Sequence, residues 1–311
     1  MDDVVNERAM RWVKNFCKIK VDGFPVTEWF RYDFHSLWYV VEPWMNVQSP
    51  YFNSVTDALQ NVKRKKSLLR FLVRHSFLPK FYARKFVIGK NMHEPVDVVL
   101  AAHTMTIRGG TDTMCDQLRE EFVKEGMSVS VVYYDDNASL GFRTLRLRKR
   151  RPYVHSIESF ANRESMGTAK YWVSHFRDTW KVMKGKEDYK RYVDGKDILF
   201  KRLRERLDFV LVRVMQEAIT HIILTKMMIH QLKPKMVVSM NFPTIIGRCV
   251  TVASKEAGIP IVGVQAGIMS RSLYYCHSKY DVLHGYPKPD ATFVYGEYSK
   301  RFLKKCANYG G

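Results

Sequence analysis

The residue types that could perform chemistry in this 311-residue chain are concentrated in three short polar stretches. The first contains His103, Arg108, Gly109 and Gly110. An imidazole at this position could act as a general base. The glycines would let an anion approach the backbone and the start of the helix that follows. In the structural alternative His103 is a hydrogen-bonded loop residue, and the sequence leaves both interpretations open.

Helix capping is the structural alternative for parts of the first two stretches. Thr111 or Asp112 could cap the helix that follows the glycines, without any ligand. The second stretch, MNFPT at 240–244, places Asn241 between a strand end and a helix with Pro243 near its first turn. Capping is the favoured role for Asn241, and substrate contact is the second.

The third stretch, residues 258–297, contains two apolar runs separated by a long polar and aromatic loop. Such a long loop between strands is more often functional than not. The remaining candidate crevice residues are Gln265, Gly267, Arg271, Tyr274, Tyr275, His277, His284 and Glu297. Cys276 precedes His277, but no orienting acid can be named, so the two are not interpreted as a nucleophile and its base.

Apolar runs and amphipathic segments alternate along the part of the chain that must position these residues. The predicted strands are 96–102, 127–134, 236–240, 259–264 and 291–295. The predicted helices are 111–124, 199–229, 243–257 and 298–306, within a mainly helical region at 153–232. This alternation predicts an α/β fold with a doubly wound, Rossmann-like parallel sheet. Ligands bind such sheets at the carboxyl ends of the strands.

Residues 1–94 are predicted to form a separate, mainly helical region ahead of an α/β domain at 95–311. Aromatic residues from Trp12 to Trp44 fill its first half. The segment 63–90 has ten basic residues and no acidic one, and it is interpreted as a basic amphipathic helix interrupted at Pro79. This helix either binds an anionic membrane surface or packs its apolar side on the next domain.

Composition narrows the partners and the compartment. A formal charge of +20 predicts an anionic partner, which could be a phosphorylated substrate, a membrane surface or nucleic acid. No nucleic-acid motif is present, so nucleic acid is the least favoured. Five widely spaced cysteines without CxxC, and scattered histidines without HxH or HExxH, predict reduced thiols and no metal site. Without a signal peptide or an apolar run near ~18 residues, we expect a cytoplasmic protein, held at the inner face of the membrane if segment 63–90 binds lipid.

The third stretch also carries a family resemblance. The segments GIPIVGVQAGIM and PKPDATFVYGEYSKRFLKK resemble the amino-terminal half of GT-B-type glycosyltransferases of surface-polysaccharide synthesis. Related glycerophosphate and sugar transferases share a similar GIP…VQHG…PD…VWGE pattern. The segments VDVVLAAHTMTIRGG…MSVSVVYYD and GFPVTEWFRYDFHSLW are similar to what precedes that pattern in some members. The resemblance covers most of the chain.

The resemblance implies a domain that holds a glycan or lipid-linked acceptor opposite a nucleotide-sugar donor, with no bound cofactor. If the histidine of the family pattern is reactive, its role is vacant here or is filled by another residue such as His103 or His277. Transfer would need a base for an acceptor hydroxyl, and His103 is the predicted base, with Gln265 and Gly267 lining the cleft. Arg108 and the two glycines after it are predicted to lie near phosphate.

Two departures from the family pattern favour a second hypothesis. Ala266 stands where the pattern has histidine, and the chain stops where a second Rossmann-like domain is expected. We therefore expect activity to need a second domain or partner. A non-catalytic module that binds a membrane surface or a nucleotide sugar is the alternative, and a nucleic-acid-binding protein is the third hypothesis.

Overall fold

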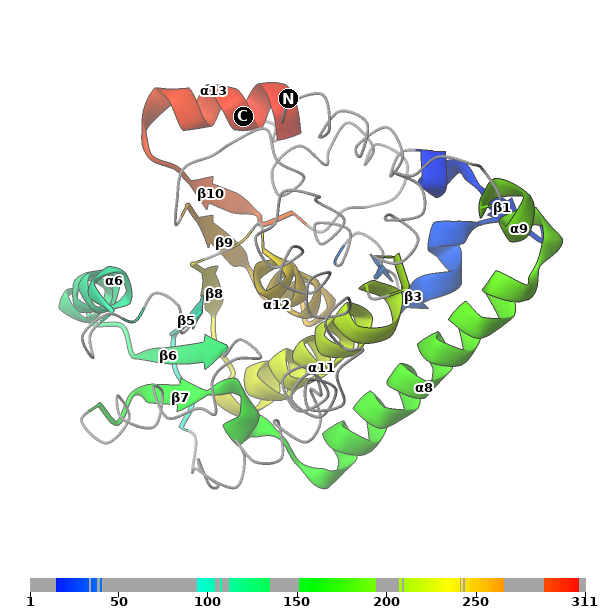
Figure 1. Ribbon diagram of the computed structural model, residues 1–311. Helices are drawn as coiled ribbons and strands as arrows, with labels where there is room; N and C mark the ends of the chain where they lie inside the picture. The colour runs from blue at the N-terminus through cyan, green and yellow to red at the C-terminus, as the bar shows by residue number, and fades with distance from the viewer. Residues whose placement is uncertain are drawn as a thin grey trace, which may run out of the picture.

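A six-stranded, all-parallel sheet forms the centre of the protein (Figure 1). The computed structural model describes residues 15–33, 35–37, 40, 94–103, 107, 112–134, 151–193, 207–208, 210–240, 242, 244–265 and 288–307. The strands of the sheet are β5 (Val98–His103), β6 (Val129–Tyr134), β7 (Val154–Ser156), β8 (Met236–Ser239), β9 (Ile261–Val264) and β10 (Ala291–Phe293). They lie in the order β10-β9-β8-β5-β6-β7, and every neighbouring pair is parallel.

Residue type explains which strands are central. The sequences of β5 (VVLAAH) and β6 (VSVVYY) are almost wholly apolar or aromatic, and every residue except the half-buried His103 is buried. Strands that are apolar on both faces are typical of parallel sheets with helices on each side. By contrast, β10 is the edge strand, and two of its three residues are exposed.

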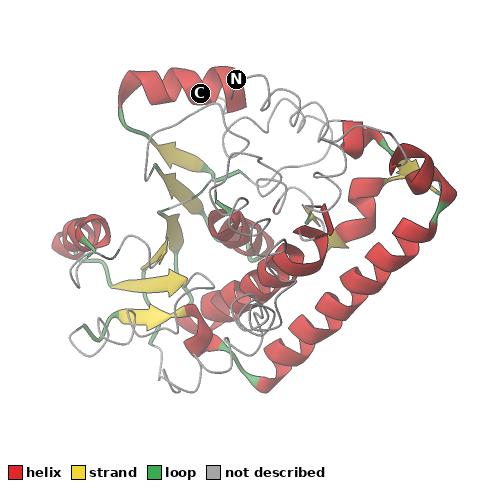
Figure 2. Ribbon diagram, viewed as in Figure 1, coloured by secondary structure: helices red, strands yellow, loops and turns green. Residues whose placement is uncertain are grey.

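Helices cover both faces of the sheet (Figure 2). Their bounds are α6 (Thr113–Lys124), α8 (Arg163–Gly185), α9 (Glu187–Val193), α11 (Met215–Leu232), α12 (Ile245–Glu256) and α13 (Gly296–Ala307). One face packs Leu100 and Val131 against Cys115 of α6. On the other face, Val99 and Val132 belong to the larger core, which includes residues of α8, α11 and α12. A π-helical turn, η5 (Val210–Val214), leads into α11.

The strand order contains a topological switch point between β5 and β8. Numbered by their sequence in the chain, the six strands lie in the order 3-2-1-4-5-6. This is the Rossmann order, in which the first half of the sheet is built outward in one direction and the second half in the other. The helices that follow β5 and β8, α6 and α12, pack on opposite faces of the sheet. Ligands of Rossmann-type sheets bind at such a switch point, outside the carboxyl ends of the strands.

The described part of the N-terminal segment packs on α8 and α11. It contains β1 (Lys20–Val21), β2 (Phe24–Pro25), the 3₁₀ helix η1 (Val26–Phe30), β3 (Arg31–Tyr32) and β4 (His35–Ser36). The ring of Phe30 lies 6.3 Å from that of Phe176 and 6.4 Å from that of Trp180, both on α8. On α11, Lys226 Nζ lies 2.8 Å from Asp33 Oδ2. The division between residues 94 and 95 stays a prediction, and the basic segment 63–90 lies outside the described residues.

The α/β class and the parallel sheet are confirmed, with three local corrections. The strand predicted at 96–102 is Val98–His103, so His103 belongs to the strand and not to the loop after it. The region 153–232, predicted as mainly helical, also contains β7, which has three residues, one of them a histidine, and is too short to show strand periodicity. The helix predicted at 111–124 begins at Thr113, because Asp112 is its N-cap.

Candidate active site at the carboxyl edge of the sheet

Strand register brings His103 and Gln265 to the same level of the sheet. Ala101 is the register partner of Ser239, and Ser239 that of Gly263. His103 comes two residues after Ala101, and Gln265 comes two residues after Gly263. The two residues therefore lie at the same level, with β8 between the two strands that lead to them. With neighbouring strands spaced by about 4.8 Å, their backbones are roughly 10 Å apart. Alternation also directs both side chains toward the face covered by α11 and α12.

His103 lies at the end of β5, directly at the switch point. It is half-buried, and its register partner on β6 is Tyr134. The Tyr134 hydroxyl is within 2.9 Å of Thr225 Oγ1, and its ring meets the His221 ring edge-on at 5.6 Å. Burial raises the pKa of Tyr134, so this phenol stays protonated at neutral pH. A proton acceptor at this level is therefore more readily supplied by the imidazole of His103 than by Tyr134.

Gln265 connects the ends of β9 and β10. The side-chain Oε1 of Gln265 accepts a hydrogen bond from the Tyr295 backbone N–H at 2.7 Å. The backbone N–H of Gln265 donates to the Phe293 carbonyl at 2.9 Å. The residue is buried. These bonds give the side chain a structural role, because they hold the two strand ends together.

Gly263 allows a close contact beside these strand ends. A Cβ atom on Gly263 would lie 2.8 Å from Cγ of Phe242, a distance that real side chains do not tolerate. The Phe242 ring, which follows β8, therefore lies directly against β9. Phe242 also packs with the buried Leu303 of α13. Glycine at 263 is thus required for the packing of the segment after β8.

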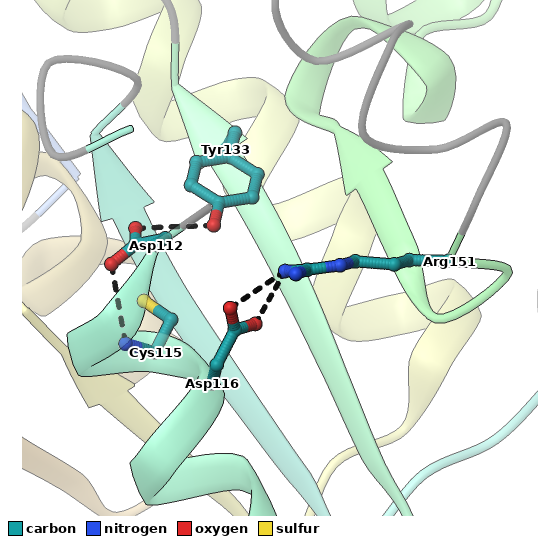
Figure 3. Close-up of polar contacts among 5 residues, drawn as sticks. All are labelled: Asp112, Cys115, Asp116, Tyr133 and Arg151. Carbon is teal, nitrogen blue, oxygen red and sulfur yellow. Dashed lines mark hydrogen bonds and ion pairs between the residues drawn. The ribbon is translucent and has the colours of Figure 1, made fainter. Parts of the chain in front are cut away.

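The start of α6 is held by a buried polar cluster (Figure 3). Asp112, which is 1% exposed, accepts hydrogen bonds from the Cys115 backbone N–H at 3.3 Å and from the Tyr133 hydroxyl at 3.1 Å. Burial, with nearby negative charge, raises the pKa values of the Cys115 thiol and the Tyr133 phenol. Both groups therefore stay protonated at neutral pH, and Cys115 is an inert thiol and not a nucleophile.

One turn further along α6, Asp116 forms a bidentate ion pair with Arg151. The distances from the guanidinium nitrogen to the two carboxylate oxygens are 2.6 and 2.7 Å. Arg119 lies over the Tyr153 ring, 3.6 Å from its centroid. These contacts connect α6 to the segment just ahead of β7, so the first turns of α6 are fixed on two sides (Figure 3).

The start of α12 has a different composition. The Thr244 hydroxyl accepts from the Gly247 N–H at 3.2 Å, and the first turn contains no acidic residue. Arg248 follows in the next turn and is fully buried. Thr244 is therefore the N-cap, and the expectation that Asn241 caps this helix is wrong. The helix begins too late for Asn241, because residues 242–244 precede its first turn.

The structure places three of the predicted site residues. His103 and Gln265 lie at the carboxyl edge as described, and Glu297 lies in the first turn of α13, after the edge strand β10. Glu297 is exposed, and its carboxylate is 3.9 Å from the Lys300 ammonium. The other predicted residues lie outside the described part of the chain: Arg108, Gly109, Gly110, Asn241, Gly267, Arg271 and His277.

Tyr133 and Thr244 are site residues that the sequence analysis did not single out. Thr244 directly precedes the apolar Ile245 and Ile246, which is a typical N-cap position. Tyr133 has the same strand parity as Val129 and Val131, which face α6, and this parity could have directed it toward Asp112.

Three further observations bound the chemistry of the described residues. Among them, no group of three or more histidine, cysteine, aspartate or glutamate side chains could hold a metal ion. None of their helices is long and apolar enough to cross a bilayer. Comparison with protein-family models, curated proteins and solved structures found no match. Functional argument for this chain therefore rests on its sequence and geometry.

Proposed function

We propose that this chain is the acceptor-side half of a GT-B-type glycosyltransferase, with its active site at the switch point between β5 and β8. The observation that carries the proposal is the strand order, because Rossmann-type sheets bind ligands at the switch point that this order contains. The nucleotide-sugar donor and a glycan or lipid-linked acceptor would meet there. The net charge of +20 supports an anionic substrate.

His103 is the proposed general base. It ends β5 at the switch point and is half-buried, so it is accessible to a substrate in the crevice. Imidazole is a common general base in proteins and could accept the proton of an acceptor hydroxyl. The neighbouring Tyr134 retains its proton, so it does not compete for that role.

The other residues of the proposed site would bind the substrate or support the strand ends. Gln265 supports the strand ends, since its Oε1 is bonded to the Tyr295 N–H. Arg108, Gly109 and Gly110 follow β5 in sequence, and we propose that they bind phosphate.

A non-catalytic nucleotide-sugar binding module is the second candidate. Gln265 uses its side-chain oxygen to join two strands, and Ala266 follows it where the resembling pattern has histidine. Both features favour a site that binds a nucleotide sugar but has no reactive side chain at these positions. The two candidates differ in whether a sugar is transferred, so a transfer assay separates them, and a substitution at His103 tests the proposed base.

The decisive experiment measures glycosyl transfer from a panel of uridine, guanosine and cytidine diphosphate sugars, with the chain alone and with candidate second domains. We expect His103→Gln to lower turnover by roughly 10²- to 10⁴-fold, the usual contribution of a general base. The dissociation constant of the nucleotide sugar, measured by calorimetry, should stay unchanged. His175→Gln, an exposed histidine on α8, is the matched control.

The outcomes distinguish the candidates. Equal turnover in His103→Gln and the parent protein would remove His103 as the base. Nucleotide-sugar binding without transfer, even with a second domain supplied, would favour the binding module. Failure of every nucleotide sugar to bind would contradict both.

A further inference from the structure

Three large side chains project into solvent along β10 and the start of α13. Phe293, Tyr295 and Tyr298 are 67%, 57% and 67% exposed. They lie within six consecutive residues at the open edge of the sheet. Tyr298 also stacks on Phe302, with 6.4 Å between ring centroids. Contiguous exposed apolar groups of this kind mark interaction surfaces more often than single exposed residues do.

The helix that follows β10 is basic. Helix α13 contains Lys300, Arg301, Lys304 and Lys305 against one acid, Glu297, so its net charge is +4 − 1 = +3. Lys300 and Glu297 are both more than half exposed and 3.9 Å apart, so their attraction is weak and screened by salt. Arg301 and Lys304 are exposed and form no ion pair with any residue that the structure describes. The cations are therefore available to an external anionic partner.

The surface is also rigidly supported. Leu303, on the buried side of α13, packs against Phe242, and β10 pairs along its length with β9. Asp290, just before β10, accepts from the Ile261 N–H at 2.8 Å and pairs with Lys255. Because the backbone is already ordered, little conformational entropy would be lost when the surface binds a partner.

We propose that the β10–α13 surface, formed by Phe293, Tyr295, Tyr298, Lys300, Arg301 and Lys304, docks on an anionic lipid membrane. Tyrosine and phenylalanine rings are stable at the level of lipid headgroups, and lysine and arginine are attracted to the negative surface potential beside them. A basic, amphipathic helix with aromatic residues is the element that lies in a membrane interface. This docking surface is separate from the segment 63–90 and does not depend on the proposed glycosyl transfer.

Helix α8 provides the contrast that makes the assignment selective. It also exposes an aromatic ring, Tyr171, and several lysines. Two of its lysines, however, lie closer to acids than Lys300 does: Lys181 is 3.2 Å from Asp178, and Lys184 is 2.9 Å from Asp208. Helix α8 exposes one large aromatic side chain where the β10–α13 segment exposes three, so we expect it to bind an anionic surface more weakly, and it supplies a matched control.

The test measures binding of the full chain to phosphatidylcholine vesicles with and without phosphatidylglycerol, by co-sedimentation. We expect binding only when phosphatidylglycerol is present. The variant Lys300→Gln/Arg301→Gln/Lys304→Gln should bind roughly 100-fold more weakly, since each lysine or arginine near the surface contributes about a fivefold change. Phe293→Ser/Tyr295→Ser/Tyr298→Ser should lose the part of the binding that survives high salt.

The control variant Tyr171→Ser/Lys181→Gln/Lys184→Gln should bind like the parent protein, and circular dichroism should show that every variant is folded. No vesicle binding by the parent protein would overturn the proposal, and so would equal binding by the α13 variants. Single-stranded nucleic acid can also stack on aromatic rings. If the α13 variants lost affinity for a single-stranded RNA while vesicle binding was unchanged, the surface would be a nucleic-acid site and the membrane assignment would be wrong.

Discussion

The amino and carboxyl ends of the central strands are held by different kinds of polar contact. At the amino edge, the Asp97 carboxylate accepts from the Ser128 N–H and hydroxyl, each at 2.8 Å, and lies 2.8 Å from the Lys235 ammonium. These residues precede β5, β6 and β8, so one partly exposed aspartate ties the starts of all three strands. At the carboxyl edge the corresponding aspartate, Asp112, is buried and bonded to Tyr133 and the start of α6.

The difference between the two aspartates is a difference in solvent access. Water can replace the partners of Asp97 when a contact is lost, so its bonds stabilise the fold only slightly. Asp112 has no such replacement, because an unsatisfied polar group away from water carries the full desolvation cost. The buried contacts of Asp112 therefore hold the start of α6 in one arrangement. Four predictions test this comparison, from the largest effect to the smallest.

Asp112→Ala should be the most damaging of these substitutions. It removes the N-cap of α6 and leaves the buried Tyr133 hydroxyl without its acceptor. The expected loss is about 2–4 kcal/mol in the free energy of unfolding, measured by urea denaturation. Asp112→Asn keeps one oxygen acceptor and should lose clearly less. A loss in Asp112→Ala no larger than that in Thr244→Ala would contradict the importance of the buried cluster.

Thr244→Ala should destabilise the protein by about 1 kcal/mol, the usual value for a lost N-cap. The Thr244 hydroxyl accepts from the Gly247 N–H at the start of α12. Thr244→Ser should restore most of the stability in the same urea assay. If the serine variant is as unstable as the alanine variant, the threonine acts through packing and not through the cap.

The Asp116 and Arg151 pair should show a coupling of about 0.5–1 kcal/mol in a double-mutant cycle with Asp116→Asn and Arg151→Gln. Both side chains are about one-fifth exposed, so the bidentate pair is only partly screened. The coupling should fall as salt is added. The exposed Lys124 and Glu121 pair on the same helix is the control and should show almost none. Equal coupling in the two pairs would show that burial does not matter here.

Asp97 should give the smallest effect, visible in acid. Hydrogen bonds from Lys235 and Ser128 hold the pKa of its carboxyl well below the usual range. Because the folded-state pKa is depressed, the stabilisation is present above the unfolded-state pKa of about 3.9 and is lost as the pH falls below it. Urea midpoints should therefore decline less steeply in acid for Asp97→Asn than for the parent protein. Identical pH profiles would contradict the assignment.

Local signals in the sequence were sufficient for the main elements of the fold. Five apolar runs predicted five of the six strands, and glycines such as Gly126 and Gly258, both with positive φ, marked helix ends. The sixth strand, β7, was missed because three residues carry no periodicity. The Asn241 cap was wrong because proximity to a proline is a weaker signal than Thr244 directly ahead of the apolar turn.

For the candidate site, the sequence placed His103 and Gln265 near strand ends but could not say that they share a level. The register between β5, β8 and β9 places the two residues at the same level. Likewise, the bonds from Tyr133 to Asp112, from Arg151 to Asp116 and from Tyr295 to Gln265 join residues 21, 35 and 30 positions apart. Such pairings depend on how the crossovers pack, which no local pattern contains.

By itself, then, the sequence determined the alternation of strands and helices, the basic character of the chain and the polar residues that follow its strands. These properties are local, because the hydrophobic periodicity of a helix or strand is determined by neighbouring residues. Only the tertiary structure decided the strand order, the switch point between β5 and β8 and the burial of Asp112. It also left Phe293, Tyr295 and Tyr298 exposed at the edge of the sheet. These depend on long-range packing, in which each strand gains its position from partners far away in the chain.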